Sequence, residues 1–312
     1  MTIAKIAAAA LITLLSSAAL AAEPESCGTV RFSDVGWTDI TATTAASTEI
    51  LKALGYQTEI KVLAVPVTYA SLANKDIDVF LGNWMPTMTA DLQPYLDAKT
   101  VETLGANLTG AKYTLATNEA GAALGITDFS KIAANKDALE GKIYGIEPGN
   151  DGNRLILEMI EKGSFDLKGF EVAESSEQGM LAQVAKLNKD NKPIVFLGWA
   201  PHPMNSNFKL TYLSGGDDVF GPDFGGATVH TNVRAGYAAE CPNVGKFITN
   251  LKFSLEMENE IMGAILDKGE EPGKAAMAWM KVNPAALEPW LAGVTTKDGG
   301  DAMAAVKTAL GM

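Results

Sequence analysis

Two segments of the chain are altered copies of one short motif: residues 79–86 read VFLGNWMP and residues 195–201 read VFLGWAP. In each copy a β-branched and aromatic run reaches a glycine, which a tryptophan and then a proline follow closely. Such runs, bounded by breakers, are typical of buried strands in an α/β sheet. These sheets bind their ligands at the carboxyl ends of the strands. The repeat therefore predicts two similar lobes with an aromatic site between them.

The amino terminus has the pattern of a secretory signal peptide over residues 1–22. Lys5 precedes an apolar run over residues 6–20, and Ala-Leu-Ala at 19–21 is a small-residue cleavage site. A membrane anchor is the alternative, but the run is short and contains Thr and Ser. No other stretch approaches the ~20 apolar residues of a spanning helix. We therefore expect an exported, periplasmic protein that is soluble after cleavage.

The net charge of the chain limits the classes of molecule that it can bind. Without residues 1–22 the chain has 24 basic and 37 acidic residues, a net charge of −13. Such a surface repels nucleic acid and anionic lipid, and attracts cationic ligands only weakly and at long range. We therefore expect no nucleic-acid partner.

The chain has two cysteines, Cys27 and Cys241. An even count in an exported chain suggests one disulfide, and two free buried thiols are the alternative. If the two residues pair, the chain must leave its first lobe and return to it.

The predicted elements alternate between strand and helix before the chain becomes wholly helical. In the first part we predict strands over 29–32, 58–65 and 77–81, and a helix over 40–54 that ends at Gly55. The middle part should hold strands over 113–117 and 142–146 and from Pro193 onward, with helical segments over 128–139, 155–162 and 175–189. A returning strand over 229–239 and helices over 244–253, 256–266, 275–280 and 302–310 should follow. The β-α-β order predicts parallel pairing with right-handed crossovers.

This order favours two α/β lobes joined by two hinge crossings, with the second lobe inserted into the first. Lobe I would comprise residues 23–111 and 217–312, and lobe II residues 112–216. The helical tail should then pack on lobe I. A single doubly wound domain is the alternative.

Aromatic and polar side chains gather at the predicted strand ends, at the first crossing and at one helix start: Trp37, Asp39, Trp84, Tyr113, Asn150 and Trp199. A cage of aromatic faces suits a cation with no N–H to donate, such as a quaternary ammonium, because the ring faces carry negative potential. Each desolvated contact of this kind contributes roughly 0.5 to 2 kcal/mol. Packing between the lobes is the alternative role for any one of these rings.

Four motifs make the chain resemble a known family: GWTDITATTA, VFLGNWMPTM, GIEPGNDGNR and VFLGWAPHPMN. They are similar to those of the periplasmic choline-binding proteins of bacterial ABC importers, which are relatives of glycine betaine and proline betaine binding proteins. The resemblance covers the whole chain after the signal. It implies a type II bilobed periplasmic-binding-protein fold, a Cys27–Cys241 disulfide, and delivery of choline to a membrane permease.

The resemblance also implies a role for each site residue. Trp37, Trp84, Tyr113 and Trp199 would form the aromatic box around the trimethylammonium group. Asp39 would be an acidic neighbour of the ligand, and Asn150 the partner of its hydroxyl.

Charge offers a physical reason to prefer choline over a betaine. A betaine carboxylate seeks N–H groups, Arg or Lys, whereas a carboxylate at Asp39 repels it. Arg154 lies nearby in sequence and could serve a betaine. We therefore predict choline as the ligand, with acetylcholine as a further candidate and betaines bound weakly, by a monomer. Binding proteins for glycine betaine, proline betaine or carnitine are the alternative within the family.

An enzyme acting on a choline-containing compound is the alternative from another class. His202 lies in a Pro-His-Pro turn and His230 in a strand pattern, and both are expected to be structural. The chain has no serine elbow, no HExxH and no Cys–His pair. The acidic, glycine-rich turns lack phosphate-loop and calcium-loop patterns. We therefore predict a protein without catalytic activity, cofactor or metal. A sensor or a lectin-like carrier stays open.

Overall fold

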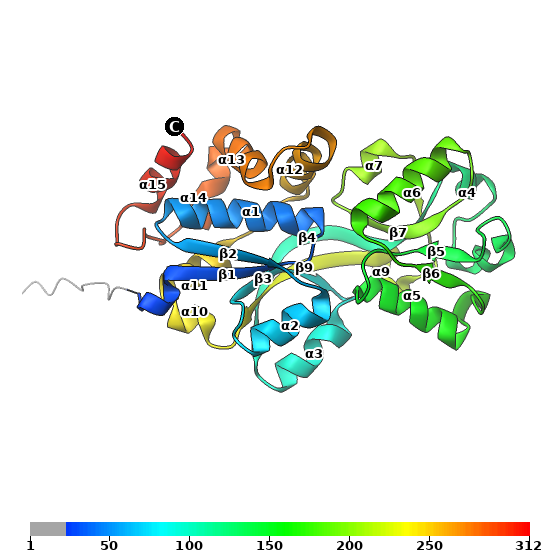
Figure 1. Ribbon diagram of the computed structural model, residues 1–312, viewed down its shortest axis with the longest axis horizontal. Helices are drawn as coiled ribbons and strands as arrows, with labels where there is room; N and C mark the ends of the chain where they lie inside the picture. Colours follow the sequence, from blue (N-terminus) through cyan, green and yellow to red (C-terminus); the bar gives the residue numbers. More distant parts are fainter. Residues whose placement is uncertain (1–22) are drawn as a thin grey trace, which may run out of the picture.

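The computed structural model describes residues 23–312 and has two halves side by side along its long axis (Figure 1). The chain opens with the 3₁₀ turn η1 (Glu25–Gly28) and then alternates strand and helix through the first half: β1 (Thr29–Asp34), α1 (Thr38–Ala53), β2 (Gln57–Val62), α2 (Val65–Ala73), β3 (Val79–Met85) and α3 (Thr89–Asp97). Strand β4 (Val101–Asn118) then carries the chain into the second half. The predicted β-α-β order of the first part is confirmed.

The second half is built from shorter elements: α4 (Glu119–Ala123), η2 (Phe129–Lys131), η3 (Ala133–Asn135), β5 (Lys142–Tyr144), α5 (Asp151–Lys162), η4 (Ser164–Asp166), β6 (Glu171–Ala173), α6 (Glu177–Lys189), β7 (Val195–Ala200), α7 (Met204–Asn207), β8 (Leu210–Tyr212), α8 (Asp217–Phe220) and α9 (Pro222–Gly225). Strand β9 (Gly226–Arg234) returns to the first half, and helices follow: α10 (Tyr237–Glu240), α11 (Pro242–Asn250), α12 (Leu255–Lys268), α13 (Pro272–Val282), η5 (Pro284–Ala286), α14 (Leu287–Trp290) and α15 (Ala302–Ala309). Helices α12, α13 and α15 contact α1, so the tail packs on the first half as expected.

One sheet runs through both halves in the order β2-β1-β3-β9-β4-β7-β5-β6, with β8 paired to β4. Strand β1 is parallel to β2 and β3 in the first half, and β5 is parallel to β6 and β7 in the second. The long strands β4 and β9 are antiparallel to each other and link the halves. This arrangement confirms the predicted bilobed α/β fold with two crossings. The lobe boundaries at 111/112 and 216/217 stay a prediction.

Strand β4 is much longer than the strand predicted over 113–117. Its first part, from Val101, contains Gly105 and Gly110, and its pairing with β9 shifts register three times. Bulges of this kind break the alternation by which a strand is recognised in a sequence. The predicted helix over 128–139 was also wrong, since the structure has only the 3₁₀ turns η2 and η3 there. Phe129 and Ile132 are both buried at a spacing of three, which a 3₁₀ turn brings onto one side.

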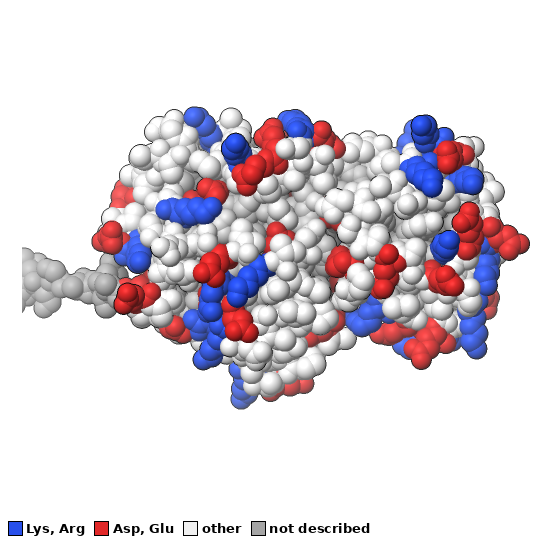
Figure 2. Space-filling view, in the orientation of Figure 1, with Lys and Arg blue, Asp and Glu red and all other residues white. Residues whose placement is uncertain are grey.

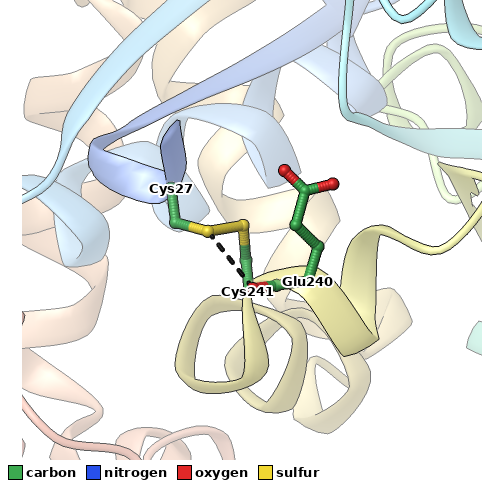
Figure 3. A group of neighbouring side chains, drawn as sticks. All are labelled: Cys27, Glu240 and Cys241. Carbon is green, nitrogen blue, oxygen red and sulfur yellow. Dashed lines mark hydrogen bonds between the residues drawn. A yellow bond between two sulfur atoms is a disulfide. The ribbon is translucent and has the colours of Figure 1, made fainter. Parts of the chain in front are cut away.

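A disulfide joins Cys27 in η1 to Cys241 at the start of α11, with their Cα atoms 5.6 Å apart (Figure 3). This confirms the predicted pair and excludes two free thiols. Glu240 lies beside the two sulfur atoms. Sulfurs bonded to each other supply no thiolate, so this cluster offers no cysteine ligands to a metal.

Acidic and basic side chains are interspersed over both halves on the face in Figure 2. The signal-peptide prediction concerns residues 1–22, which lie outside the described residues. Among the helices of residues 23–312, none is long and apolar enough to cross a membrane.

Candidate ligand-binding site

One pocket is lined by residues from both halves and from the crossing strand β4: Trp37, Asp39, Trp84, Tyr113, Ile146, Asn150, Asp151 and Trp199. All six residues singled out in the sequence are therefore brought together. Ile146 and Asp151 line the same pocket and were missed. None of the described residues that line it is basic.

The repeated motif places two of the rings. Trp84 lies near the end of β3, and Trp199 near the end of β7, where it pairs directly with Tyr113 of β4. The centroid of the Tyr113 ring lies 5.9 Å from that of the Trp84 ring and 6.3 Å from that of the Trp199 ring. Trp37 immediately precedes α1 and completes the aromatic lining. All four rings are at most 5% exposed.

Hydrogen bonds occupy the polar edges of three of these rings. The Trp37 indole N–H donates to Glu147 Oε1 at 2.9 Å, and the Trp84 indole N–H donates to Asp39 Oδ2 at 3.1 Å. The Tyr113 hydroxyl donates to Asn150 Oδ1 at 2.9 Å. The rings are thereby fixed in orientation, and what they can still offer a ligand is their apolar, electron-rich faces.

Asp39 lies in the first turn of α1 and is almost wholly buried. Its Oδ2 accepts from Trp84, whereas its Oδ1 has no hydrogen-bond partner. Burial, together with the nearby charge of Glu177, raises the pKa of Asp39 to about 8. A cation in the pocket would favour the ionised carboxylate, because an opposite charge offsets the cost of burial.

The side chain of Asn150 caps α5, and most of its hydrogen-bonding capacity is already taken up within the protein. Its Oδ1 accepts from the backbone N–H of Asn153 at 3.1 Å as well as from Tyr113. Its Nδ2 donates to Asp151 Oδ1 at 3.2 Å and keeps one further N–H. Gly152 makes this packing possible, because a Cβ at that position would collide with the Tyr113 hydroxyl.

Asp151, the first residue of α5, is the main feature that sequence analysis missed. It is 1% exposed, and its Oδ2 has no hydrogen-bond partner. Burial raises the pKa of Asp151 to about 6. No signal in the sequence set it apart, because acids are common in the first turn of a helix.

Five hydrogen bonds join the halves around the pocket. Besides the bond from Trp37 to Glu147, the carboxylate of Glu177 accepts from the backbone N–H and hydroxyl of Thr38. Arg154 donates to the Thr87 carbonyl oxygen at 3.0 Å and pairs with Asp91 at 2.8 Å. These contacts require the two halves to be close together.

Arg154 was the residue that could have served a ligand carboxylate. Its guanidinium instead bonds Asp91, Thr87 and, at 3.1 Å, Glu158. It does not line the pocket. Arg154 is therefore not available to bind a ligand carboxylate. This agrees with the predicted preference for a ligand without a carboxylate.

Neither histidine lines the pocket. The buried His202 accepts from the Met204 backbone N–H through Nδ1, so its Nε2 carries the proton and donates to Glu177 Oε1 at 3.2 Å. His202 thereby holds the carboxylate that contacts Thr38. His230 is 3.0 Å from the Thr228 hydroxyl within β9.

Two solved structures are highly similar to this chain over 92% of its length and the whole of theirs, at 76% sequence identity. One is an ABC-transporter choline-binding protein in complex with choline, with a TM-score of 0.92. The other is such a protein in an unliganded semi-closed conformation, with a TM-score of 0.85. The present structure is thus nearer to the liganded form, in agreement with the contacts between its halves, and has the type II periplasmic-binding-protein fold.

A curated relative agrees with this likeness. The glycine betaine/carnitine transport binding protein GbuC of Listeria monocytogenes is 31% identical over 178 residues, which cover 56% of this chain and 58% of GbuC. Residues 28–282 match the family described as the substrate-binding domain of ABC-type glycine betaine transport systems. The protein therefore belongs to this family of transport substrate-binding proteins.

Proposed function

We propose that this protein binds choline outside the cytoplasm and delivers it to the permease of an ABC importer. The observation that carries the proposal is the pocket of four aromatic rings and a buried carboxylate oxygen without a partner. The choline complex of the 76% identical protein supports it. Residues 1–22 would direct export and be removed.

The aromatic box would supply the affinity. A trimethylammonium group has no N–H, so it gains little from hydrogen-bond acceptors and much from ring faces. Four contacts at roughly 0.5 to 2 kcal/mol each amount to several kcal/mol. Choline has about seven heavy atoms, and a ceiling of ~1.5 kcal/mol per atom permits micromolar binding or tighter.

Charge would supply the preference for choline over betaines. Asp39 and Asp151 both line the pocket, and the described lining has no Lys or Arg. A betaine carboxylate would face two buried acids and no cation, which is costly in a site that excludes water. Acetylcholine keeps the cationic head but has no hydroxyl proton, so we expect it to bind more weakly than choline.

Closure would complete the site. We propose that residues 112–216 move as one lobe against residues 23–111 and 217–312, with β4 and β9 as the hinge. The contacts of Trp37 and Thr38 with the second half, and of Arg154 with the first half, would form only on closing. One chain supplies the whole lining, so a monomer suffices, and the protein would release choline unchanged.

Calorimetric titration of the purified protein with choline, acetylcholine and glycine betaine tests the proposal. We expect choline to bind at micromolar affinity or tighter and more than about tenfold tighter than glycine betaine. Chromatography of the ligands after incubation should recover them intact. Equal affinity for choline and glycine betaine would refute the role of Asp39, and turnover would point to an enzyme.

A further inference from the structure

We propose that His202 is a positioning residue for ligand binding, because it holds both the ring of Trp199 and a carboxylate that joins the two halves. This inference rests on the proposed choline function and assigns a role to a residue outside the pocket lining. The sequence indicated only a structural role for His202. Its contacts instead link one ring of the aromatic box to the contact between Glu177 and Thr38.

The first argument concerns what fixes the ring of Trp199. The indole N–H groups of Trp37 and Trp84 donate to carboxylates, whereas that of Trp199 donates to no group in the described part of the chain. Packing holds the Trp199 ring instead. The imidazole of His202 lies 4.9 Å from it, centroid to centroid, in a T-shaped arrangement, and the ring of Tyr113 lies 6.3 Å away. Loss of the imidazole would therefore free one side of a ring that is expected to contact the ligand.

The second argument concerns the tautomer of the imidazole. His202 is 1% exposed, and its Nδ1 accepts the backbone N–H of Met204 at 2.9 Å. The ring proton therefore lies on Nε2, which donates to Glu177 Oε1 at 3.2 Å. Because both ring nitrogens are bonded, the imidazole is fixed in orientation and presents one defined donor. A donor that is already ordered loses little entropy when it bonds the carboxylate.

The third argument concerns the donors to Glu177, whose side chain is fully buried. Within the described chain its carboxylate accepts two hydrogen bonds from Thr38, in the other half, and one from His202, in its own half. If the halves separate as proposed, the bonds from Thr38 are lost and the bond from His202 is kept. His202 would thus hold the carboxylate in the orientation that caps α1 when the halves meet.

The acids around Glu177 make this fixed donor important. Burial, and to a lesser extent the charge of Glu177, raises the pKa of Asp34, Asp39 and Glu147. The Glu177 carboxylate thus lies among like charges, which repel it, and N–H and O–H donors hold it against that repulsion. Without the His202 donor the carboxylate would no longer be held at the start of α1, next to Trp37 and Asp39.

Three substitutions separate the two contacts of the imidazole, with choline dissociation followed by stopped-flow tryptophan fluorescence. His202→Ala removes both contacts and should raise the dissociation rate about tenfold or more, as expected for a lost hydrogen bond to a charged group. His202→Phe keeps a ring beside Trp199, and His202→Gln keeps an N–H for Glu177, so each should recover part of this loss. If His202 only filled space, Phe would restore the rate and Gln would not.

A double-mutant cycle tests whether His202 acts through Glu177. Glu177→Ala removes the carboxylate, so adding His202→Phe to it should weaken choline binding by less than about twofold more, because the bond between the two residues is already lost. Full additivity of the two losses would show that His202 does not act through Glu177 and would overturn the proposal. The cycle and the Phe and Gln variants decide the question even if His202→Ala does not fold.

Phe170→Leu is the matched control for a purely structural loss. Phe170 is a buried ring of the second half that lies outside the pocket lining. This variant should lower the melting temperature and leave the choline dissociation rate within about twofold. An unchanged dissociation rate in the three His202 variants would overturn the assignment, even if their melting temperatures fall. A folded wild type that binds no choline would instead refute the proposed function itself.

Discussion

The carboxylate of Glu177, the first residue of α6, accepts hydrogen bonds from the backbone N–H of Thr38 at 2.8 Å and from its hydroxyl at 2.5 Å. Thr38 is the first residue of α1, so an acid of the second half caps a helix of the first half. Trp37 and Asp39, which flank Thr38, both line the pocket. The contact between the two halves and the residues that line the pocket are therefore adjacent in the chain.

Glu177→Gln should weaken choline binding about tenfold, mainly by faster dissociation. The variant loses a charged cap on α1 and hydrogen bonds that, under the proposed closure, form only in the closed state, each contributing about 1 to 3 kcal/mol. Stopped-flow tryptophan fluorescence measures the dissociation rate. The exposed Glu171→Gln is the control. An unchanged dissociation rate in Glu177→Gln would show that this contact does not hold the closed form.

Trp199→Ala should lose about 30-fold or more in choline affinity, because a desolvated cation–π contact contributes about 2 kcal/mol. Trp84→Ala should behave in the same way, and calorimetry checks both. Trp279→Ala is the matched control, since Trp279 lies in α13 and bonds Glu260 rather than lining the pocket. Equal losses in all three variants would indicate a general loss of stability instead of a lost ligand contact.

The fold should lose stability in the absence of choline as the pH rises. Burial raises the pKa of Asp39 to about 8 and that of Asp151 to about 6, both above their unfolded values. A raised carboxyl pKa means that folding favours the protonated form. The associated stability is therefore complete below the unfolded pKa of about 4 and is lost as the pH rises through the folded value.

Thermal unfolding between pH 5 and about 9, with and without choline, measures this effect. We expect the melting temperature of the unliganded protein to fall across this range and choline to raise it more at the alkaline end, because the cation favours ionised Asp39. Asp39→Asn should flatten the dependence. A choline-induced shift that shrinks towards alkaline pH would contradict the account of Asp39.

Reduction of the Cys27–Cys241 disulfide should lower the free energy of unfolding by about 2 to 5 kcal/mol. It should leave choline affinity at 25 °C within about twofold, because the bond joins η1 to α11 and neither element lines the pocket. Denaturant unfolding and calorimetry of the Cys27→Ser/Cys241→Ser variant check both parts. A large loss of affinity in the folded variant would place the disulfide in the coupling between halves.

The sequence predicted the aromatic residues of the pocket more completely than its polar residues, for physical reasons. Trp84 and Trp199 could be found because strand motifs recur, and strand ends in an α/β sheet lie at the ligand edge. Asp151 could not be found, since acids in the first turn of a helix are common and most of them face solvent. The position of the Arg154 side chain depends on its salt bridge to Asp91, a residue that only the fold brings close to it.

The fold was similarly predictable where its pattern is local. Buried strands such as β3 and β7, and helices with clear caps such as α6, followed from their residue patterns. The bulged start of β4 did not, because its pairing with β9 shifts register and its glycines obscure the alternation. The lobe boundaries and the ligand roles of the six predicted site residues stay predictions.

The central claim is that rings from both halves enclose a quaternary ammonium group. A crystal structure of the protein with choline tests this most directly, through the distances from the choline nitrogen to four ring centroids. The account predicts that the nitrogen lies within about 6 Å of the rings of Trp37, Trp84, Tyr113 and Trp199. A choline nitrogen bound away from these rings, or contacting rings of one half alone, would contradict it.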